Sequence, residues 1–460
     1  MNRIQQQTLR SKRLRLACLA VCVLLLMTGC SRFIPVPAEN LVRPPRLGGT
    51  NALLEAAFEK HVQQGEYVLR YPASGVNKTA YVRYDCDGDG LDEALVFYSL
   101  RSEEMVVRIC MMDFDGTDWT AADDLVGDGP DVYSVDFLDL DNNGISEILV
   151  GWTSLDAKSN KHLTVYGTEA GAFAYHAVGM ESYTELYSVD MDADGQTELL
   201  LTLITSGADK YSVECKLFKF LDSGGGSSLE LRGQTELYSE TVSFDGFQSE
   251  KQDGVVRVYI DENAGSTHLT EIVYWDAQST NLARAMTLDP TTLASSPVAR
   301  SLPIKCRDVD GDGTIEVPST AVLAESRVLA VEPDAEDEPV YVVTWSRFGA
   351  EGFTPVTTYV ENTAGGYRFT FEEQESELFR ITIDPEHGLM RFDEARPEGE
   401  TLFTIYDSAA DAMPPGTRTL TSDEERVWSY QITPVGLRNA IDRTYLSDRF
   451  SLIETEERVS

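Results

Sequence analysis

The sequence predicts a mainly β protein: a β-propeller of about five four-stranded blades, with a short helix before it and a small α+β domain after it. An acidic nine-residue phrase occurs four times, at the spacing of successive propeller blades. The residues on either side of each phrase have the composition of β-strands. With 460 residues and 42% apolar side chains, the chain can hold two or three globular domains.

Residues 1–29 are predicted to be an export signal. The apolar run Leu16–Met27 follows a basic segment, is too short to span a bilayer and is typical of a signal-peptide core. The next residues, Thr28-Gly29-Cys30, complete a segment that resembles a bacterial lipobox, with Met27 in place of the usual leucine. The resemblance implies that Cys30 is lipidated and anchors the protein at the extracytoplasmic face of the cell membrane. An ordinary signal peptide cut elsewhere, or an uncleaved anchor, is the alternative.

Residues 30–49 are predicted to be a spacer, because several prolines and Gly48-Gly49 favour an extended chain without a core of its own. The predicted propeller, with its preceding helix, takes up residues 50–361. The predicted α+β domain follows in residues 362–460. That last segment alternates strand-like runs with a helical pattern at Val435–Leu446.

The formal net charge of −38 argues against polyanionic partners. Such a surface repels nucleic acid and anionic lipid head groups, and it attracts divalent cations. Acidic residues also serve solubility alone, so the charge becomes informative only through its pattern.

Four cysteines remain beyond the signal and Cys30: Cys86, Cys110, Cys215 and Cys306. Their spacing fits no zinc pattern. Export permits disulfides, and buried free thiols are equally compatible with the sequence.

Two short elements precede the first acidic phrase. Apolar residues at helical spacing predict a helix over Leu53–Val62, which Gly65 can end. Tyr67–Tyr71 has strand character and is predicted to close the ring of blades.

The acidic phrase has the form D-x-D-x-[DN]-G-x-x-E, and we number its positions 1 to 9. Its copies are named loops 1 to 4 and comprise residues 85–93, 139–147, 190–198 and 308–316. A fifth stretch, Asp261–Gly265 followed by Glu271, looks like a decayed copy. Successive copies begin roughly 50 to 70 residues apart, which suits one blade of four strands.

The phrase has the chemistry of a calcium loop. Calcium takes six to eight oxygen ligands, and acids at positions 1, 3 and 5 of a tight turn converge on one point. The glycine at position 6 permits the turn, and the glutamate at position 9 closes the cage. An EF-hand would need an acid at position 12, which is Val96, Val150, Leu201 or Ser319 here.

The flanks of the loops predict a hairpin around each loop. The runs before the loops are Tyr81–Tyr84, Val135–Leu138, Leu186–Val189 and Ile304–Arg307. The runs after the first three loops are Glu93–Tyr98, Glu147–Trp152 and Glu198–Leu203.

Together, the loops and flanking strands resemble the FG-GAP/VCBS-type repeats of integrin-like β-propellers, over about residues 79–361. The resemblance implies calcium ligands at Asp85, Asp87, Asp89, Glu93, Asp139, Asp141, Asn143, Glu147, Asp190, Asp192, Asp194, Glu198, Asp308, Asp310, Asp312 and Glu316. We expect about three to four ions, weaker binding at Asn143 and none at the fifth stretch. The ions are expected to brace the fold.

A catalytic motif is not found in the sequence. The five histidines lie in no metal-protease frame, and neither a nucleophile elbow nor a phosphate loop occurs. We therefore expect a membrane-anchored binding or scaffold module for envelope proteins or glycans, and not an enzyme. The alternative is a carboxylate-dependent glycan hydrolase or lyase, which would need two acids facing each other in a deep pocket. An assembly factor for exported proteins is indistinguishable from the first hypothesis at this level.

Overall fold

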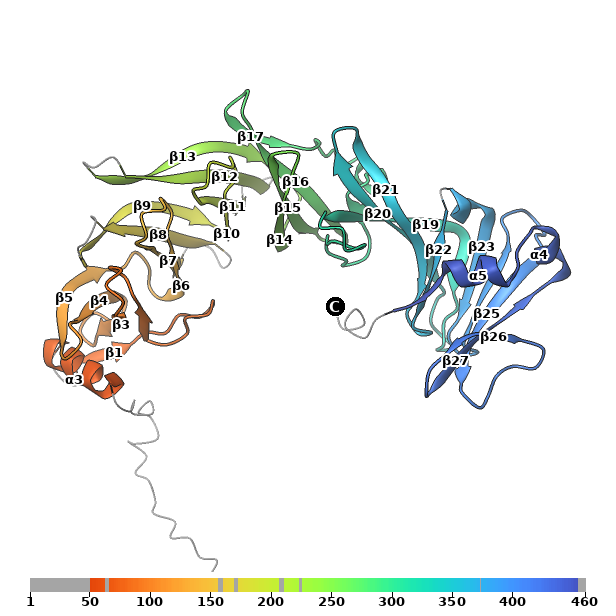
Figure 1. Cartoon of the computed structure of the whole chain (residues 1–460), viewed down its shortest axis with the longest axis horizontal. Helices are drawn as coiled ribbons and strands as arrows, with labels where there is room; N and C mark the ends of the chain where they lie inside the picture. The colour runs from red at the N-terminus through yellow and green to blue at the C-terminus, as the bar shows by residue number, and fades with distance from the viewer. Residues whose placement is uncertain are drawn as a thin grey trace, which may run out of the picture. The chain divides into compact units, whose positions relative to one another are not determined.

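The computed structural model describes residues 50–62, 66–155, 160–168, 173–206, 211–222, 226–372 and 374–453. It is mainly β, with 55% of the structure in strands and four-stranded antiparallel sheets recurring along the chain (Figure 1). The prediction of a mainly β protein is therefore confirmed. The predicted signal at residues 1–29, the lipidation site Cys30 and the spacer to residue 49 lie outside the described residues.

The chain divides into two compact units, residues 1–61 and 62–460. The described part of the first unit belongs to helix α3 (Thr50–Val62), which confirms the helix predicted at Leu53–Val62. Its predicted end at Gly65 lies outside the described residues. Across the described ranges, no helix combines the length and the apolar character needed to cross a bilayer.

Three antiparallel sheets come first in the second unit. The first contains β1 (Tyr67–Leu69), β2 (Tyr81–Tyr84), β3 (Glu93–Leu100), β4 (Arg108–Phe114) and β5 (Trp119–Val126). The second contains β6 (Val132–Leu138), β7 (Glu147–Thr153), β8 (Lys161–Thr168) and β9 (Tyr175–Tyr183). The third contains β10 (Glu185–Val189), β11 (Glu198–Ser206), β12 (Tyr211–Asp222) and β13 (Ser227–Glu236). In each sheet, neighbours in the chain are also neighbours in the ladder, apart from β1.

The first strand does not close a ring, so that prediction for Tyr67–Tyr71 is wrong. β1 instead pairs with the last three residues of β3, from Tyr98 to Leu100. β2 pairs with the first four residues of the same strand, from Glu93 to Val96. Because β3 is long enough for both short strands, their hydrogen-bonding groups are satisfied within the first sheet.

The fourth sheet contains β14 (Ser243–Gln252), β15 (Val255–Ala264), β16 (Thr267–Asp276), β17 (Asn281–Arg284) and β18 (Ala299–Arg300), which follows the 3₁₀ helix Leu293–Ser295. The stretch Asp261–Gly265, predicted as a decayed loop, mostly lies within β15. Asp261 is buried, accepts a hydrogen bond from Thr270 at 2.6 Å and pairs with buried Arg300 at 2.8 Å. These contacts fix Asp261 in the sheet. The interpretation of this stretch as a decayed loop is therefore wrong.

The fifth sheet has ten strands in the order β26-β27-β25-β24-β23-β19-β20-β21-β22-β28. Their bounds are β19 Glu316–Val328, β20 Glu338–Gly349, β21 Gly352–Asn362, β22 Tyr367–Phe371, β23 Phe379–Asp384, β24 Leu389–Glu394, β25 Thr401–Ala409, β26 Arg418–Ser422, β27 Arg426–Ile432 and β28 Phe450–Leu452; a 3₁₀ helix occupies Glu375–Leu378. The boundary predicted at residue 362 falls between the paired strands β21 and β22. One hydrophobic core joins side chains from both sides of that boundary, including Val342, Val360, Phe369, Phe392 and Phe403.

The helix predicted over Val435–Leu446 is two short helices, α4 (Pro434–Arg438) and α5 (Arg443–Arg449). Ala440 has a left-handed backbone between them, with φ +59°. The Asp442 side chain accepts the N–H of Tyr445 and so caps the start of α5. The single-helix prediction is therefore wrong, because a cap signal inside the pattern starts a second helix.

Successive sheets pack face to face, and each interface is a hydrophobic cluster with side chains from two neighbouring sheets. Representative members, in chain order of the interfaces, are Phe97 with Trp152, Leu149 with Phe220, Leu200 with Val258, and Tyr259 with Val317. All eight side chains are buried. Burial of apolar surface at every interface therefore stabilises the order of the sheets.

The interface between the first two sheets generates a testable prediction. Gly127, between β5 and β6, lies so close to Trp152 that an added Cβ would overlap the indole ring. Because this ring is fully buried, Gly127→Ala should lower the stability of the fold by about 1–3 kcal/mol. Thermal unfolding would measure the loss. Gly349→Ala is the control, since a Cβ there meets nothing within 4 Å; equal melting temperatures for the two variants would contradict the packing described.

Candidate metal centres

Loops 1, 2 and 3 each join the first two strands of a four-stranded ladder: β2 to β3, β6 to β7 and β10 to β11. The hairpins predicted around them are confirmed. Loop 4 precedes β19, and its closing pair is a single bridge between Arg307 and Glu316. The predicted strand Ile304–Arg307 is thus reduced to that bridge.

Each loop is held by the same set of hydrogen bonds from its own backbone. In loop 1, Asp85 accepts the N–H of Gly88 at 2.9 Å and that of Gly90 at 3.1 Å. The position-6 glycine donates to the position-1 aspartate in every loop, at 2.8–3.1 Å. The residue at position 7 donates to the side chain at position 5 in every loop, at 2.7–2.9 Å. These bonds fix the orientation of the side chains at positions 1 and 5.

Glycine at position 6 is required by the backbone of the turn. Gly90, Gly144, Gly195 and Gly313 all have φ between +87° and +92°. L-residues with a Cβ avoid this region, whereas glycine enters it without strain. The conserved form of the four loops is therefore a consequence of one backbone conformation.

The glutamate at position 9 begins the strand after each loop and is buried there. Glu93, Glu147, Glu198 and Glu316 are at most 1% exposed. Each accepts the backbone N–H of position 2, at 2.7–3.0 Å. Burial, together with the charges of nearby loop aspartates, raises the pKa of Glu93 and Glu147 to about 7, although backbone hydrogen bonds act in the opposite direction.

The structure brings three carboxylates of each loop together, with ligand atoms within 4.8 Å of one another. The groups are Asp85, Asp87 and Glu93; Asp139, Asp141 and Glu147; Asp190, Asp192 and Asp194; and Asp308, Asp310 and Glu316. The remaining predicted ligands Asp89, Glu198 and Asp312 lie outside these groups. Asn143 donates its side-chain amide to Asp141 at 3.1 Å. Clusters of carboxylate oxygens suit hard cations such as calcium or magnesium.

Two basic residues at these loops were not anticipated from the sequence. The Lys219 ammonium lies 2.6 Å from Asp194, 2.7 Å from Glu198 and 3.6 Å from Asp192 in loop 3. The Arg347 guanidinium lies 2.5 Å from Asp312, 3.1 Å from Glu316 and 3.5 Å from Asp310 in loop 4. Strand register could have suggested them, because the ladder pairs Glu316 directly with Arg347.

Hydrogen bonds connect neighbouring loops across the sheet interfaces. The Tyr175 hydroxyl lies 2.7 Å from the carbonyl oxygen of Cys86 in loop 1 and 2.9 Å from that of Ser146 in loop 2. Asn142 of loop 2 donates to the carbonyl of Gly195 in loop 3. Loops 1, 2 and 3 therefore form a row along one edge of the stacked sheets.

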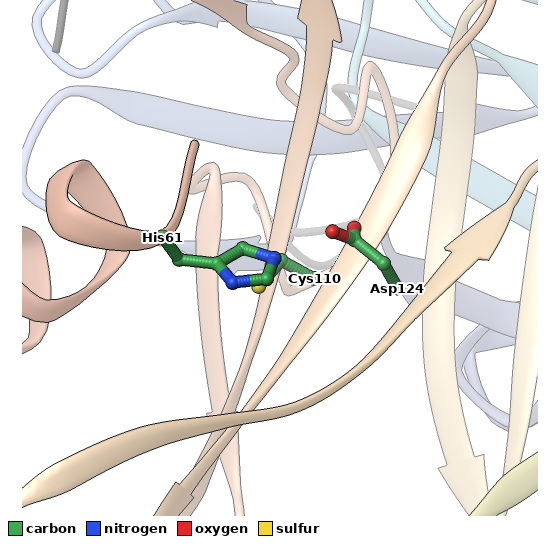
Figure 2. Close-up of side chains that lie close together, drawn as sticks. All are labelled: His61, Cys110 and Asp124. Atoms are coloured by element: carbon green, nitrogen blue, oxygen red, sulfur yellow. The ribbon is translucent and has the colours of Figure 1, made fainter. Parts of the chain in front are cut away.

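The four described cysteines are buried free thiols, which resolves the alternative left open by the sequence. Cys110 on β4 lies opposite Asp124 on β5, as Figure 2 shows. Burial, and then the charge of Asp124, raises the pKa of Cys110 to about 12. Asp124 also accepts a hydrogen bond from Tyr98 at 2.9 Å. A thiol held in its protonated form is a poor nucleophile, so Cys110 has a structural role.

A pair of buried acids lies in the fourth sheet, on β15 and β16. Glu262 is fully buried and Glu271 is 3% exposed. Glu271 accepts a hydrogen bond from Arg284 at 3.2 Å, whereas Glu262 accepts one from the Thr241 hydroxyl. Burial raises the pKa of Glu262, and the neighbouring Glu271 raises it further. Burial therefore favours the protonated form of Glu262.

A groove with a volume of about 940 Å³ lies on the fifth sheet. Its lining is a mixture of apolar and hydroxyl side chains with two acids, Glu372 and Glu377. Glu372 is already paired with Arg449 at 2.7 Å. The apolar part of the lining includes Ala321, Val342, Pro355, Val356, Phe371 and Phe379.

No model of a known protein family matches the chain, and no curated protein matches it. The geometry of the loops and of the groove therefore carries the functional argument.

The buried acid pair predicts a pH effect on stability. An unfolded glutamate has a pKa of about 4.3, and the folded pKa of Glu262 is higher. The stabilising contribution of protonated Glu262 is therefore fully present below about pH 4.3 and is lost as the pH rises through the folded pKa. Glu262→Gln should raise the melting temperature at pH 8 relative to the wild type, and the difference should shrink toward pH 5. The exposed Glu351→Gln is the control; parallel pH profiles for wild type and Glu262→Gln would contradict the assignment.

Proposed function

We propose that this protein is an exported, lipid-anchored binding or scaffold module whose acidic loops bind calcium. In this proposal the successive sheets are blades of a β-propeller related to the FG-GAP/VCBS type. The ions stabilise the body, and a protein or glycan of the cell envelope is the ligand. The observation that carries the calcium part is the convergence of three carboxylates in each loop.

The propeller interpretation is supported by the order and packing of the sheets. Four-stranded antiparallel ladders follow one another along the chain, and each packs its face against the next. The loop between the first two strands recurs at the same place in the first three sheets. Both features are typical of propeller blades.

Calcium is favoured over other metals by the chemistry of the loops. All the predicted ligands are carboxylate or amide oxygens, which suit hard cations. The loops contain neither histidine nor, apart from Cys86, cysteine. The Cys86 thiol is buried, and its pKa is raised by burial and by Glu93, so it is not disposed to bind a metal as a thiolate. An irregular loop tolerates the long, flexible coordination of calcium better than the strict octahedron of magnesium.

A binding role is supported by the groove on the fifth sheet. Its volume of about 940 Å³ is in the range of ligand sites, and apolar side chains form much of its lining. The glycan-hydrolase alternative would need two acids facing each other in such a pocket. The buried acid pair Glu262 and Glu271 does not line this groove, and Glu372 in the groove is paired with Arg449. These observations favour binding over hydrolysis.

Calcium binding has a direct test. Calcium should raise the melting temperature of the full chain, purified in detergent, because at 100 times the dissociation constant it stabilises the folded state by about 2.7 kcal/mol per site. EDTA should reverse this effect. Glu93→Gln should lose calcium uptake at loop 1, because the amide keeps the hydrogen bond to Cys86 but removes a charged ligand. Thermal unfolding would measure the shift in melting temperature, and titration calorimetry would measure calcium uptake. The exposed Glu104→Gln is the matched control. Indifference of the wild type to both calcium and EDTA would refute the calcium part.

The binding role is tested at the groove. Val356 lines it and is 36% exposed, so Val356→Glu should weaken the capture of envelope proteins or glycans at least tenfold without unfolding the protein. Val331→Glu is the matched control, because Val331 is exposed and lies outside the groove. Pull-downs from a bacterial envelope extract, followed by affinity measurement with the captured molecule, would provide the comparison. Equal capture by both variants would exclude the groove as the binding site.

A further inference from the structure

The four loops differ in the residue that faces the position-9 glutamate from the next strand of the ladder. The ladder pairs Glu316 with Arg347 in the fifth sheet. In the first three sheets, the strand pairing stops one residue short of the glutamate. Extended by that one residue, the same register places Lys219 beside Glu198, Asp113 beside Glu93 and Gly167 beside Glu147. The same structural position is therefore basic at loops 3 and 4, acidic at loop 1 and without a side chain at loop 2.

In loop 3 the chain supplies its own cation. The Lys219 side chain is only 6% exposed, and its ammonium contacts carboxylates of positions 3, 5 and 9. Both close contacts, 2.6 Å to Asp194 and 2.7 Å to Glu198, are charge-assisted hydrogen bonds. The ammonium thus pairs with three of the four loop carboxylates, whereas the buried Oδ1 atom of Asp190 makes no hydrogen bond within the described part of the chain.

In loop 4 a guanidinium takes the same place. Arg347 bonds to the carboxylates of Asp312 and Glu316 and approaches Asp310. The Oε1 atom of the position-9 glutamate accepts from the basic side chain in both loops.

In loop 1 the equivalent Oε1 atom has no such partner. Glu93 is fully buried, and its Oε1 makes no hydrogen bond with any residue in the described part of the chain. Leaving a buried carboxylate oxygen unpaired is costly, so this atom points to a cation that the chain itself does not provide. The neighbouring Asp113 adds a further acid instead of a base.

We propose that Lys219 and Arg347 act as built-in cations for loops 3 and 4, so that divalent ions bind at loops 1 and 2 alone. The inference rests on the proposed calcium function and specifies which loops carry it. It also revises the expectation of about three to four ions to about two. The requirement for metal is then confined to the first two sheets.

Loops 2 and 3 differ in whether a basic side chain occupies the loop, and not in their net charge. Loop 3 with Lys219 has the same formal charge as loop 2, where Asn143 replaces one acid. A calcium ion needs its oxygens at about 2.3–2.6 Å, and an ammonium hydrogen-bonded to two of them competes for the same oxygens. Because Lys219 is tethered, its effective concentration at the loop is in the millimolar range or above, and a free ion must displace it.

The stoichiometry of calcium uptake tests this division. Titration calorimetry on the full chain, purified in detergent and freed of calcium, should give about two ions per chain for the wild type. Lys219→Met and Arg347→Met should each add about one ion, because each exposes the oxygens of one loop. Lys216→Met is the matched control: Lys216 lies on the same strand, pairs with Glu214 at 2.8 Å and touches no loop, so uptake should not change.

A second measurement needs no variant. Hydrogen exchange of the wild type with calcium and with EDTA should show lost protection at loops 1 and 2 and unchanged protection at loops 3 and 4. Uptake of three or more ions by the wild type, or variants that add none, would overturn the division of the loops while leaving calcium binding intact. EDTA effects at loops 3 and 4 would also overturn it. A wild type and variants that all bind no calcium would instead refute the proposed function itself.

Discussion

The hydrogen bond from the position-2 backbone N–H to the buried position-9 glutamate is the interaction on which every acidic loop depends. The glutamate begins a strand, so the sheet fixes the position of its carboxylate. The N–H groups of the tight turn orient the aspartates. Carboxylates gathered in this way repel one another, and burial makes the repulsion stronger. Each loop therefore needs a proton or a cation to offset it.

The structure answers this need in more than one way. Lys219 and Arg347 bring positive charge from a neighbouring strand, whereas burial raises the pKa of Glu93 and Glu147 toward neutrality. In the fourth sheet, Arg300 pairs with Asp261, and burial raises the pKa of Glu262. The strongly acidic composition is thus compatible with a well-packed body because buried acids such as Glu198, Glu316 and Asp261 are paired with basic side chains.

How far the sequence predicts this structure depends on how local each signal is. The loops and their hairpins were predictable, since the turn residues and flanking strands lie within a few residues of one another. Lys219 and Arg347 were not, because they lie 21 and 31 residues after the glutamates they contact, and only the register brings them together. The decayed loop predicted at Asp261–Gly265 is wrong because acids near a glycine have the composition of a loop, although an ion pair holds Asp261 in a strand. The single helix predicted over residues 435–446 is wrong because the apolar spacing continues across Asp442, which caps the start of a second helix.

The ten-stranded sheet has a consequence for dissecting the chain. Gly365-Gly366 looks like a natural place to cut, yet it joins two strands that are hydrogen-bonded neighbours over one aromatic core. A fragment ending there would carry β21 as a bare edge and half of that core as exposed apolar surface, a combination that invites aggregation. A fragment meant to isolate the acidic loops should therefore either keep the ten-stranded sheet whole or omit it completely.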